Sequence, residues 1–174
     1  GLFTPEVKDG RADVVAFVKN IQSKVNSQEG NNLPVSAFVD YADGSTPSGS
    51  AEYEKRGIAV DIPVWKSENC VQCNRCAYVC PHAVIRPVAL TEEELAKAPE
   101  GTEAIDMIGM PGLKFTMTVS VYDCTGCGSC VNVCPGKKGE KALVMKSLEE
   151  NAASQEVFDF GREIEVKPEV VAKF

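Results

Sequence analysis

The strongest constraint on this chain is the distribution of its cysteines, which form a run of four that is then repeated. All eight cysteines lie in the two runs, with identical spacing in each: Cys70, Cys73, Cys76 and Cys80, then Cys124, Cys127, Cys130 and Cys134. A proline, Pro81 or Pro135, follows each run directly. Because no cysteine is left over, the thiols must be used as two sets of four.

The spacing Cys-x-x-Cys-x-x-Cys-x-x-x-Cys-Pro is that of bacterial ferredoxins that carry two 4Fe–4S clusters. Each iron of such a cluster needs one soft thiolate, and three cysteines two residues apart let a tight loop reach three irons. The fourth cysteine lies where the chain turns away from its own loop, and the proline fixes φ there. The pattern therefore predicts that the last cysteine of each run binds the cluster of the other run.

The predicted ligand sets thus cross between the runs. Cluster A is assigned Cys70, Cys73, Cys76 and Cys134, and cluster B is assigned Cys124, Cys127, Cys130 and Cys80. Zinc is the first rival, but zinc knuckles use paired cysteines and have no use for a third cysteine at this spacing. Disulfides are the second rival, and they suit an exported chain with widely spread cysteines. We predict no catalytic residue and no cofactor besides the two clusters.

Charge and hydropathy exclude other classes of partner. The formal net charge is −7, and a chain this acidic lacks the basic residues that neutralise phosphates, so we expect no nucleic-acid binding. A partner with a basic docking face would instead be attracted. No apolar run of about 18 residues is present, so we expect no membrane span. Since no secretory signal precedes the cysteines, we expect a reducing, cytoplasmic location.

Hydrophobic periodicity predicts the elements around the cysteine runs. In chain order they are a helix over residues 11–27, a strand over 35–39, a loop over 40–50, a strand over 57–65, a helix from Thr91 to about Ala98 that opens with a capping box, a loop over 99–112, and strands over 114–122 and 142–145. The predicted fold class is α+β: a bacterial two-cluster ferredoxin-like module with an inserted helix and strand.

Residues beside the cysteines are expected to tune the clusters rather than to react. Gly126 and Gly128 allow backbone N–H groups to approach sulfur closely, while Gln72 makes the first loop more polar. Trp65 is expected to pack as a lid over the first loop. His82, the single histidine, is expected at the surface or at a helix start.

Several segments resemble the pyruvate:ferredoxin (flavodoxin) oxidoreductase family. They are Leu33–Phe38, the Glu-Lys-Arg segment Tyr53–Ala59, Ile62–Trp65, Glu68–Pro87, and Cys134–Pro135 with Glu140–Met145. The resemblance implies a small Glu-Lys-Arg domain followed by a ferredoxin-like domain. It also implies that two clusters pass electrons from a thiamine-pyrophosphate site, through a third cluster, to external ferredoxin or flavodoxin. Segments for thiamine diphosphate, coenzyme A and the third cluster are not recognised, so we expect a chain that is not catalytically complete by itself.

The resemblance also implies a division of the chain. Residues 1–32 would be the helical end of a preceding domain, 33–60 the Glu-Lys-Arg domain or linker, 61–150 the two-cluster domain, and 151–174 an extension toward an absent thiamine-diphosphate domain. The expected function is intramolecular electron relay in an anaerobic 2-oxoacid oxidoreductase, with the remaining domains of that enzyme as partners. Two alternatives stay open: a stand-alone ferredoxin or subunit of another anaerobic redox complex, and a scaffold whose metal only folds it.

Overall fold

The computed structural model describes residues 11–172, and the chain divides into two compact units between Gly57 and Ile58. Each unit has its own apolar cluster and is described by itself. No helix among the described residues is long and apolar enough to cross a lipid bilayer.

The first unit is built on a continuous helical stretch, which confirms the helix predicted over residues 11–27. It comprises α1 (Ala12–Phe17), a π-helical stretch (Val18–Gln22) and α2 (Ser23–Asn26). Its apolar face is the one that the periodicity indicated, with Val14, Phe17, Val18 and Ile21 buried against Leu33, Tyr41 and Tyr53. The ring of Phe17 meets that of Tyr41 edge to face, at 5.0 Å between centroids.

The strand predicted over residues 35–39 is wrong, because Val35–Tyr41 form a 3₁₀-helix. Pro34 caps this helix, and the N–H of Ala37 donates to the carbonyl of Pro34 at 2.9 Å. The β-branched residues that suggested a strand are largely exposed, with Val35 at 89% and Val39 at 67%. Without a neighbouring strand to receive them, local hydrogen bonds decided the conformation.

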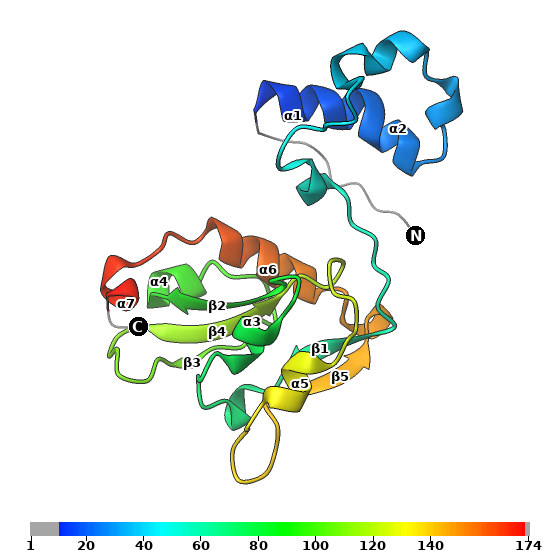
Figure 1. The fold of residues 1–174 in the computed structure, drawn as a ribbon. Coiled ribbons are helices and arrows are strands. Elements are labelled where there is room, and N and C mark those ends of the chain that lie inside the picture. Colours follow the sequence, from blue (N-terminus) through cyan, green and yellow to red (C-terminus); the bar gives the residue numbers. More distant parts are fainter. Residues whose placement is uncertain (1–10, 173–174) are drawn as a thin grey trace. The chain divides into compact units, whose positions relative to one another are not determined.

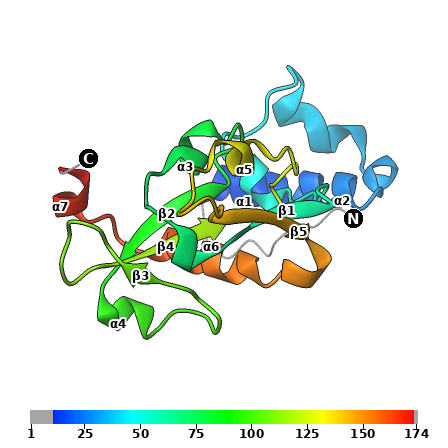
Figure 2. The same ribbon diagram turned by 90° about the horizontal axis from the view of Figure 1, so that it is seen from below.

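The second unit contains two antiparallel sheets that carry the cysteine runs. In one sheet β1 (Asp61–Trp65) pairs with β5 (Leu143–Ser147), so that Trp65 lies opposite Leu143. In the other, β4 (Lys114–Val119) lies between β2 (Ile85–Leu90) and β3 (Ile105–Asp106). Figures 1 and 2 show the short helices α3 (Arg75–Val79) and α5 (Ser129–Val133), one after each cysteine loop, on the same side of these sheets.

Helix α6 (Ser154–Glu163) runs along β4 in both views (Figures 1 and 2). Gly161 allows this close packing, because a Cβ there would lie 3.1 Å from methyl groups of Val88 and Thr118. The last helix, α7 (Pro168–Val171), is held near the sheet by Lys167, whose ammonium lies 2.8 Å from the Glu94 carboxylate.

The α+β class is confirmed, although individual boundaries shift. The predicted strands over 57–65, 114–122 and 142–145 are present as the shorter or displaced β1, β4 and β5. Strand β2 was missed; Pro87 sits inside it, which is tolerated because β2 is an edge strand of its sheet. Helix α6 was also missed, since Phe158 is its buried residue and no side chain caps its start.

The capping box predicted at Thr91 is confirmed in α4 (Glu92–Leu95). The N–H of Glu94 donates to the Thr91 hydroxyl at 3.1 Å, and the N–H of Thr91 donates to the Glu94 carboxylate at 2.7 Å. A four-residue helix depends heavily on such a cap, because so few of its backbone groups bond within the helix.

We therefore predict that Thr91→Ala destabilises α4 by about 1 kcal/mol, since the Glu94 N–H loses its acceptor. Hydrogen–deuterium exchange of the holoprotein should show faster exchange at residues 92–96. Thr91→Ser retains the hydroxyl and should keep the original protection. Equal exchange in both variants would contradict a role for the cap.

Candidate metal centre

The two cysteine loops adopt the same unusual backbone conformation. In the first loop Gln72 and Asn74 have φ of 54° and 56°; in the second, Gly126 and Gly128 have φ of 70° and 73°. These left-handed positions suit glycine, whereas other residues occupy them at a cost. Each pair stands at the same spacing from its cysteines, so the sequence repeat is also a structural repeat.

The left-handed turns bring backbone N–H groups onto sulfur. The N–H of Gln72 lies 3.4 Å from Cys70 Sγ, and the N–H of Gly126 lies 3.4 Å from Cys124 Sγ. Such donors stabilise negative charge on a thiolate or on a cluster that it holds. The backbone N–H expected to approach sulfur in the second loop therefore does so. The first loop makes the same N–H contact with sulfur, although it has no glycine at the matching position.

The last cysteine of each run turns away from its own loop. Cys80 follows α3 and Cys134 follows α5, and both have extended backbone, with ψ of 115° and 117°. The next residue in each case is a proline, which disfavours helical conformation in the residue before it. The chain therefore leaves the helix at the cysteine in both halves.

Two cavities in the second unit collect the cysteines. The A cavity is lined by Cys70, Cys73, Cys76 and Cys134, and the B cavity is lined by Cys80, Cys124, Cys127 and Cys130. Each cavity thus combines three cysteines of one run with the last cysteine of the other run. The ligand sets assigned from the sequence stay a prediction, and these are the same groupings.

The surroundings of the thiols are largely apolar. Burial raises the pKa of Cys76 to about 12 and that of Cys130 to about 11, with neighbouring cysteines adding to both shifts. Burial also raises the pKa of Cys124, whereas hydrogen bonding to Ser129 lowers the pKa of the exposed Cys127. The buried thiols are therefore protonated near neutral pH unless iron replaces their protons.

The residues present fit two 4Fe–4S clusters. All eight cysteines, which lie within the described residues, are free of disulfides. Among residues 11–172, no three His, Cys, Asp or Glu side chains are close enough together to hold a single ion. That observation concerns single ions, because in a 4Fe–4S cluster each cysteine binds a different iron. Four thiols around one largely apolar cavity, with N–H groups on sulfur, are the donors that a cluster requires.

A polar clamp on the first loop was not identified from the sequence. The side chain of Gln72 donates to the carbonyl of Asp106 at 2.7 Å and accepts from the N–H of Ile108 at 2.9 Å. It therefore ties the first loop to the segment inserted between the cysteine runs. Because Gln72 lies in the left-handed region, this clamp helps to hold a conformation that favours glycine.

Lys141 is a second residue beside the site that the sequence analysis did not single out. Its ammonium donates to the carbonyls of Val131 and Asn132, the latter at 3.1 Å. A cation at the C-terminal end of α5 satisfies free carbonyls next to Cys134. The expected surface position of His82 is confirmed, and this residue also lines the B cavity.

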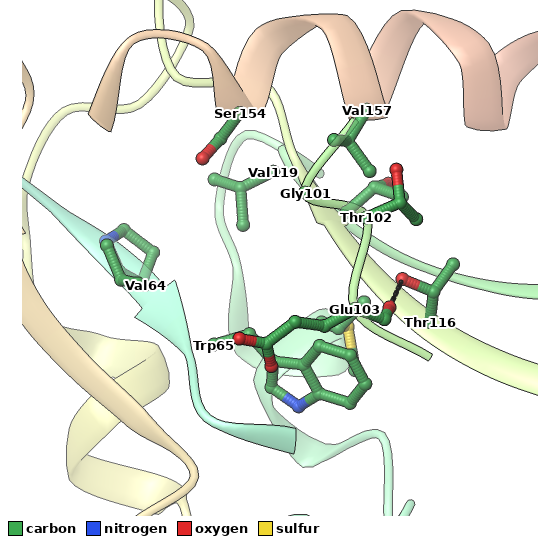
Figure 3. A pocket seen from close by; sticks show the side chains of 12 residues that line it. Val64, Trp65, Gly101, Thr102, Glu103, Thr116, Val119, Ser154 and Val157 are labelled. Atoms are coloured by element: carbon green, nitrogen blue, oxygen red, sulfur yellow. Dashed lines mark hydrogen bonds between the residues drawn. The ribbon is translucent and has the colours of Figure 1, made fainter. Parts of the chain in front are cut away.

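A third cavity lies on the far side of Trp65 and contains no cysteine. Figure 3 shows it between Val64, Ser154 and Val157, with the indole at one end. The hydroxyl of Thr116 donates to the carbonyl of Glu103 at 2.7 Å along its wall. Trp65 lines both this cavity and the A cavity, as does Met117, in keeping with the expected lid.

Comparisons with known proteins agree with the site. Residues 4–59 match the profile of EKR, a domain of unknown function, and residues 69–138 match the profile of the 4Fe-4S dicluster domain. The fold and the site thus define an iron–sulfur protein with a dicluster domain. Its cofactors are two 4Fe–4S clusters, as predicted.

Relatives place these two domains in one family of enzymes. The chain is 45% identical to the pyruvate-flavodoxin oxidoreductase of Enterobacter agglomerans over 159 residues, which are 91% of the chain and 13% of the relative. It is 48% identical to the pyruvate:ferredoxin oxidoreductase of Moorella thermoacetica over 161 residues, again 91% of the chain and 13% of the relative. A pyruvate dehydrogenase [NADP(+)] of Cryptosporidium parvum is 42% identical over 144 residues, 81% of the chain and 7% of the relative.

The chain is therefore an EKR domain followed by a 4Fe-4S dicluster domain, homologous to pyruvate-flavodoxin and pyruvate:ferredoxin oxidoreductases. This confirms the resemblance noted in the sequence. The chain spans about 13% of the length of these two relatives. The predicted four-part division of the chain, with boundaries after residues 32, 60 and 150, stays a prediction.

The glycines of the second loop provide a test of its geometry. At Gly126 a Cβ would lie 3.0 Å from the carbonyl oxygen of Asp61 and 3.4 Å from the Ala59 Cβ, whereas Gly128 has open space around it. We predict that Gly128→Ala costs about 1–2 kcal/mol for its left-handed backbone alone. Gly126→Ala should cost more, because it adds a steric clash to the same strain.

Thermal bleaching of cluster absorbance in the purified holoprotein measures this difference. We expect bleaching at a lower temperature, and a lower iron content, for Gly126→Ala than for Gly128→Ala. If Gly128→Ala bleached at the lower temperature instead, the backbone of β1 would not be in close contact with Gly126.

Proposed function

We propose that the chain relays single electrons between two 4Fe–4S clusters, one held by the four cysteines of the A cavity and the other by those of the B cavity. The supporting observation is that each cavity gathers four cysteines, three from one run and one from the other. When bound, each cluster accepts and releases one electron. The packing of α3 against α5 brings the two cysteine runs together in one compact unit.

The polypeptide contributes three things to this relay. Its thiolates hold the clusters, its loop N–H groups stabilise the negative charge that reduction adds, and its apolar walls exclude water. Each cavity also has one exposed cysteine, Cys73 in the first and Cys127 in the second. Because electron transfer is fastest over short distances, these exposed corners are the proposed points of entry and exit.

We further propose that this relay works inside a larger oxidoreductase, with its remaining domains as partners and an external ferredoxin or flavodoxin as acceptor. Homology to pyruvate-flavodoxin and pyruvate:ferredoxin oxidoreductases, extending over both domains and 91% of the chain, supports this setting. It favours the relay over a stand-alone ferredoxin, which would need no EKR domain. The substrate class that the names of these relatives suggest is pyruvate.

The crossed ligand sets predict which cluster is lost when a single cysteine is substituted. Anaerobically prepared protein should contain about eight irons and eight sulfides, and its reduced form should show two magnetically coupled clusters by EPR. Cys80→Ala should impair the cluster of Cys124, Cys127 and Cys130, and Cys134→Ala should impair the other one. Each variant should therefore keep one intact cluster and lose the coupling signal.

Ser129→Ala is a suitable control, because Ser129 contacts the Cys127 sulfur without being one of the proposed ligands. It should retain both clusters. Full iron content in Cys80→Ala would contradict the crossed assignment. Two zinc ions without sulfide in the unaltered protein would contradict the relay itself.

A further inference from the structure

The buried polar atoms that lack partners are concentrated around one of the two cavities. Within residues 11–172 the buried side-chain atoms without a hydrogen-bond partner are Gln22 Oε1, Trp65 Nε1 and Asn74 Oδ1. Gln22 belongs to the first unit, whereas both Trp65 and Asn74 line the A cavity. The residues that line the B cavity include none of the three. The surroundings of the A cavity therefore hold polar groups that the protein itself leaves unsatisfied.

The indole of Trp65 is held in place on several sides. Its backbone ends β1 opposite Leu143, and its ring meets that of Phe115 edge to face, at 6.0 Å between centroids. In Figure 3 the indole nitrogen lies on the edge of the ring that is turned away from Ser154 and Val157. The N–H is thus directed away from the third cavity and is shielded from solvent.

An indole N–H can only donate, and leaving a buried donor unpaired is costly. The carboxylate of Glu103, which lines the third cavity with Trp65, accepts from the N–H of Ser67 at 3.3 Å. Trp65 also lines the A cavity with Cys70, Cys73, Cys76 and Cys134, so a cluster bound there would bring sulfur acceptors beside it. Sulfur atoms of such clusters accept hydrogen bonds, and these bonds set their potential.

We infer that the indole N–H of Trp65 donates a hydrogen bond to a sulfur of the cluster in the A cavity and raises the reduction potential of that cluster. The inference rests on the proposed ligand sets. Reduction adds negative charge to the cluster, and a donor aimed at sulfur stabilises this charge. Trp65 would then tune the reduction potential of the cluster in addition to packing as a lid over the first loop.

At the matching position of the repeat, the second half has no indole. Trp65 stands five residues before Cys70, and the residue five before Cys124 is Val119. Val119 is buried, 5% exposed, and its side chain has no hydrogen to donate. The structure therefore provides a reason for the two clusters to differ in potential, with the indole acting on one of them.

Redox titration of the Trp65→Phe holoprotein, followed by EPR, tests the inference. We expect one of the two midpoint potentials to fall and the other to stay, with about eight irons retained. The midpoint potential that stays is the internal control for the one that falls. Unchanged potentials in Trp65→Phe, or an equal shift of both, would overturn the inference.

A second measurement needs no variant. Trp65 is the single tryptophan, so a ¹H–¹⁵N spectrum of the holoprotein contains one indole signal. We expect this signal to be shifted by the paramagnetic cluster and to exchange slowly with solvent. A sharp signal at the usual position, in protein with about eight irons, would overturn the inference and leave the proposed relay intact. Failure of the relay would appear instead as a wrong iron or sulfide content.

Discussion

The interaction on which the second unit depends is the meeting of the two cysteine runs around shared cavities. Cys134 closes the A cavity and Cys80 closes the B cavity, so neither cavity can form from one run alone. With iron and sulfide bound, this exchange would tie β1 and α3 to α5 and β5 more tightly than their packing does. Metal binding and folding are then linked, as in other small metal-dependent domains.

The same arrangement makes ionised thiols unfavourable unless metal is bound. Buried thiols such as Cys76 have a raised pKa, and four of them around an apolar cavity would repel one another if ionised without metal. Cluster binding replaces their protons with iron and satisfies the N–H groups that already point at sulfur. The arrangement requires left-handed backbone in both loops. Glycine adopts this conformation readily in the second loop, and the side-chain hydrogen bonds of Gln72 support it in the first.

The two halves of the repeat have therefore diverged in how they reach one geometry. The first loop is tied by Gln72 to the inserted segment at Asp106 and lies under Trp65. The second loop uses glycines and lies beside the exposed His82. Since hydrogen bonds and solvent exposure set cluster potentials, a duplicated motif with unequal surroundings can direct electrons along one route.

Sequence patterns were reliable where local chemistry decides conformation, as in the capping box at Thr91 and the helix beginning near residue 11. They failed where pairing between strands decides the conformation. Residues 35–39 carry strand-like side chains but have no strand beside them, and β2 was hidden by Pro87, which only an edge position allows. Helix α6 was missed although it is amphipathic, because no side chain caps its start and Phe158 is its buried residue.

The sequence by itself determined the cofactor chemistry, because eight thiols at this spacing suit two iron–sulfur clusters and little else. It also pointed to the enzyme family through segments that the comparisons bear out. Only the tertiary structure gave Gln72 its partners at Asp106 and Ile108 and set Trp65 against Phe115, since these partners are distant in sequence. Periodicity records which face of an element is buried, but not which distant donor will lie beside which sulfur.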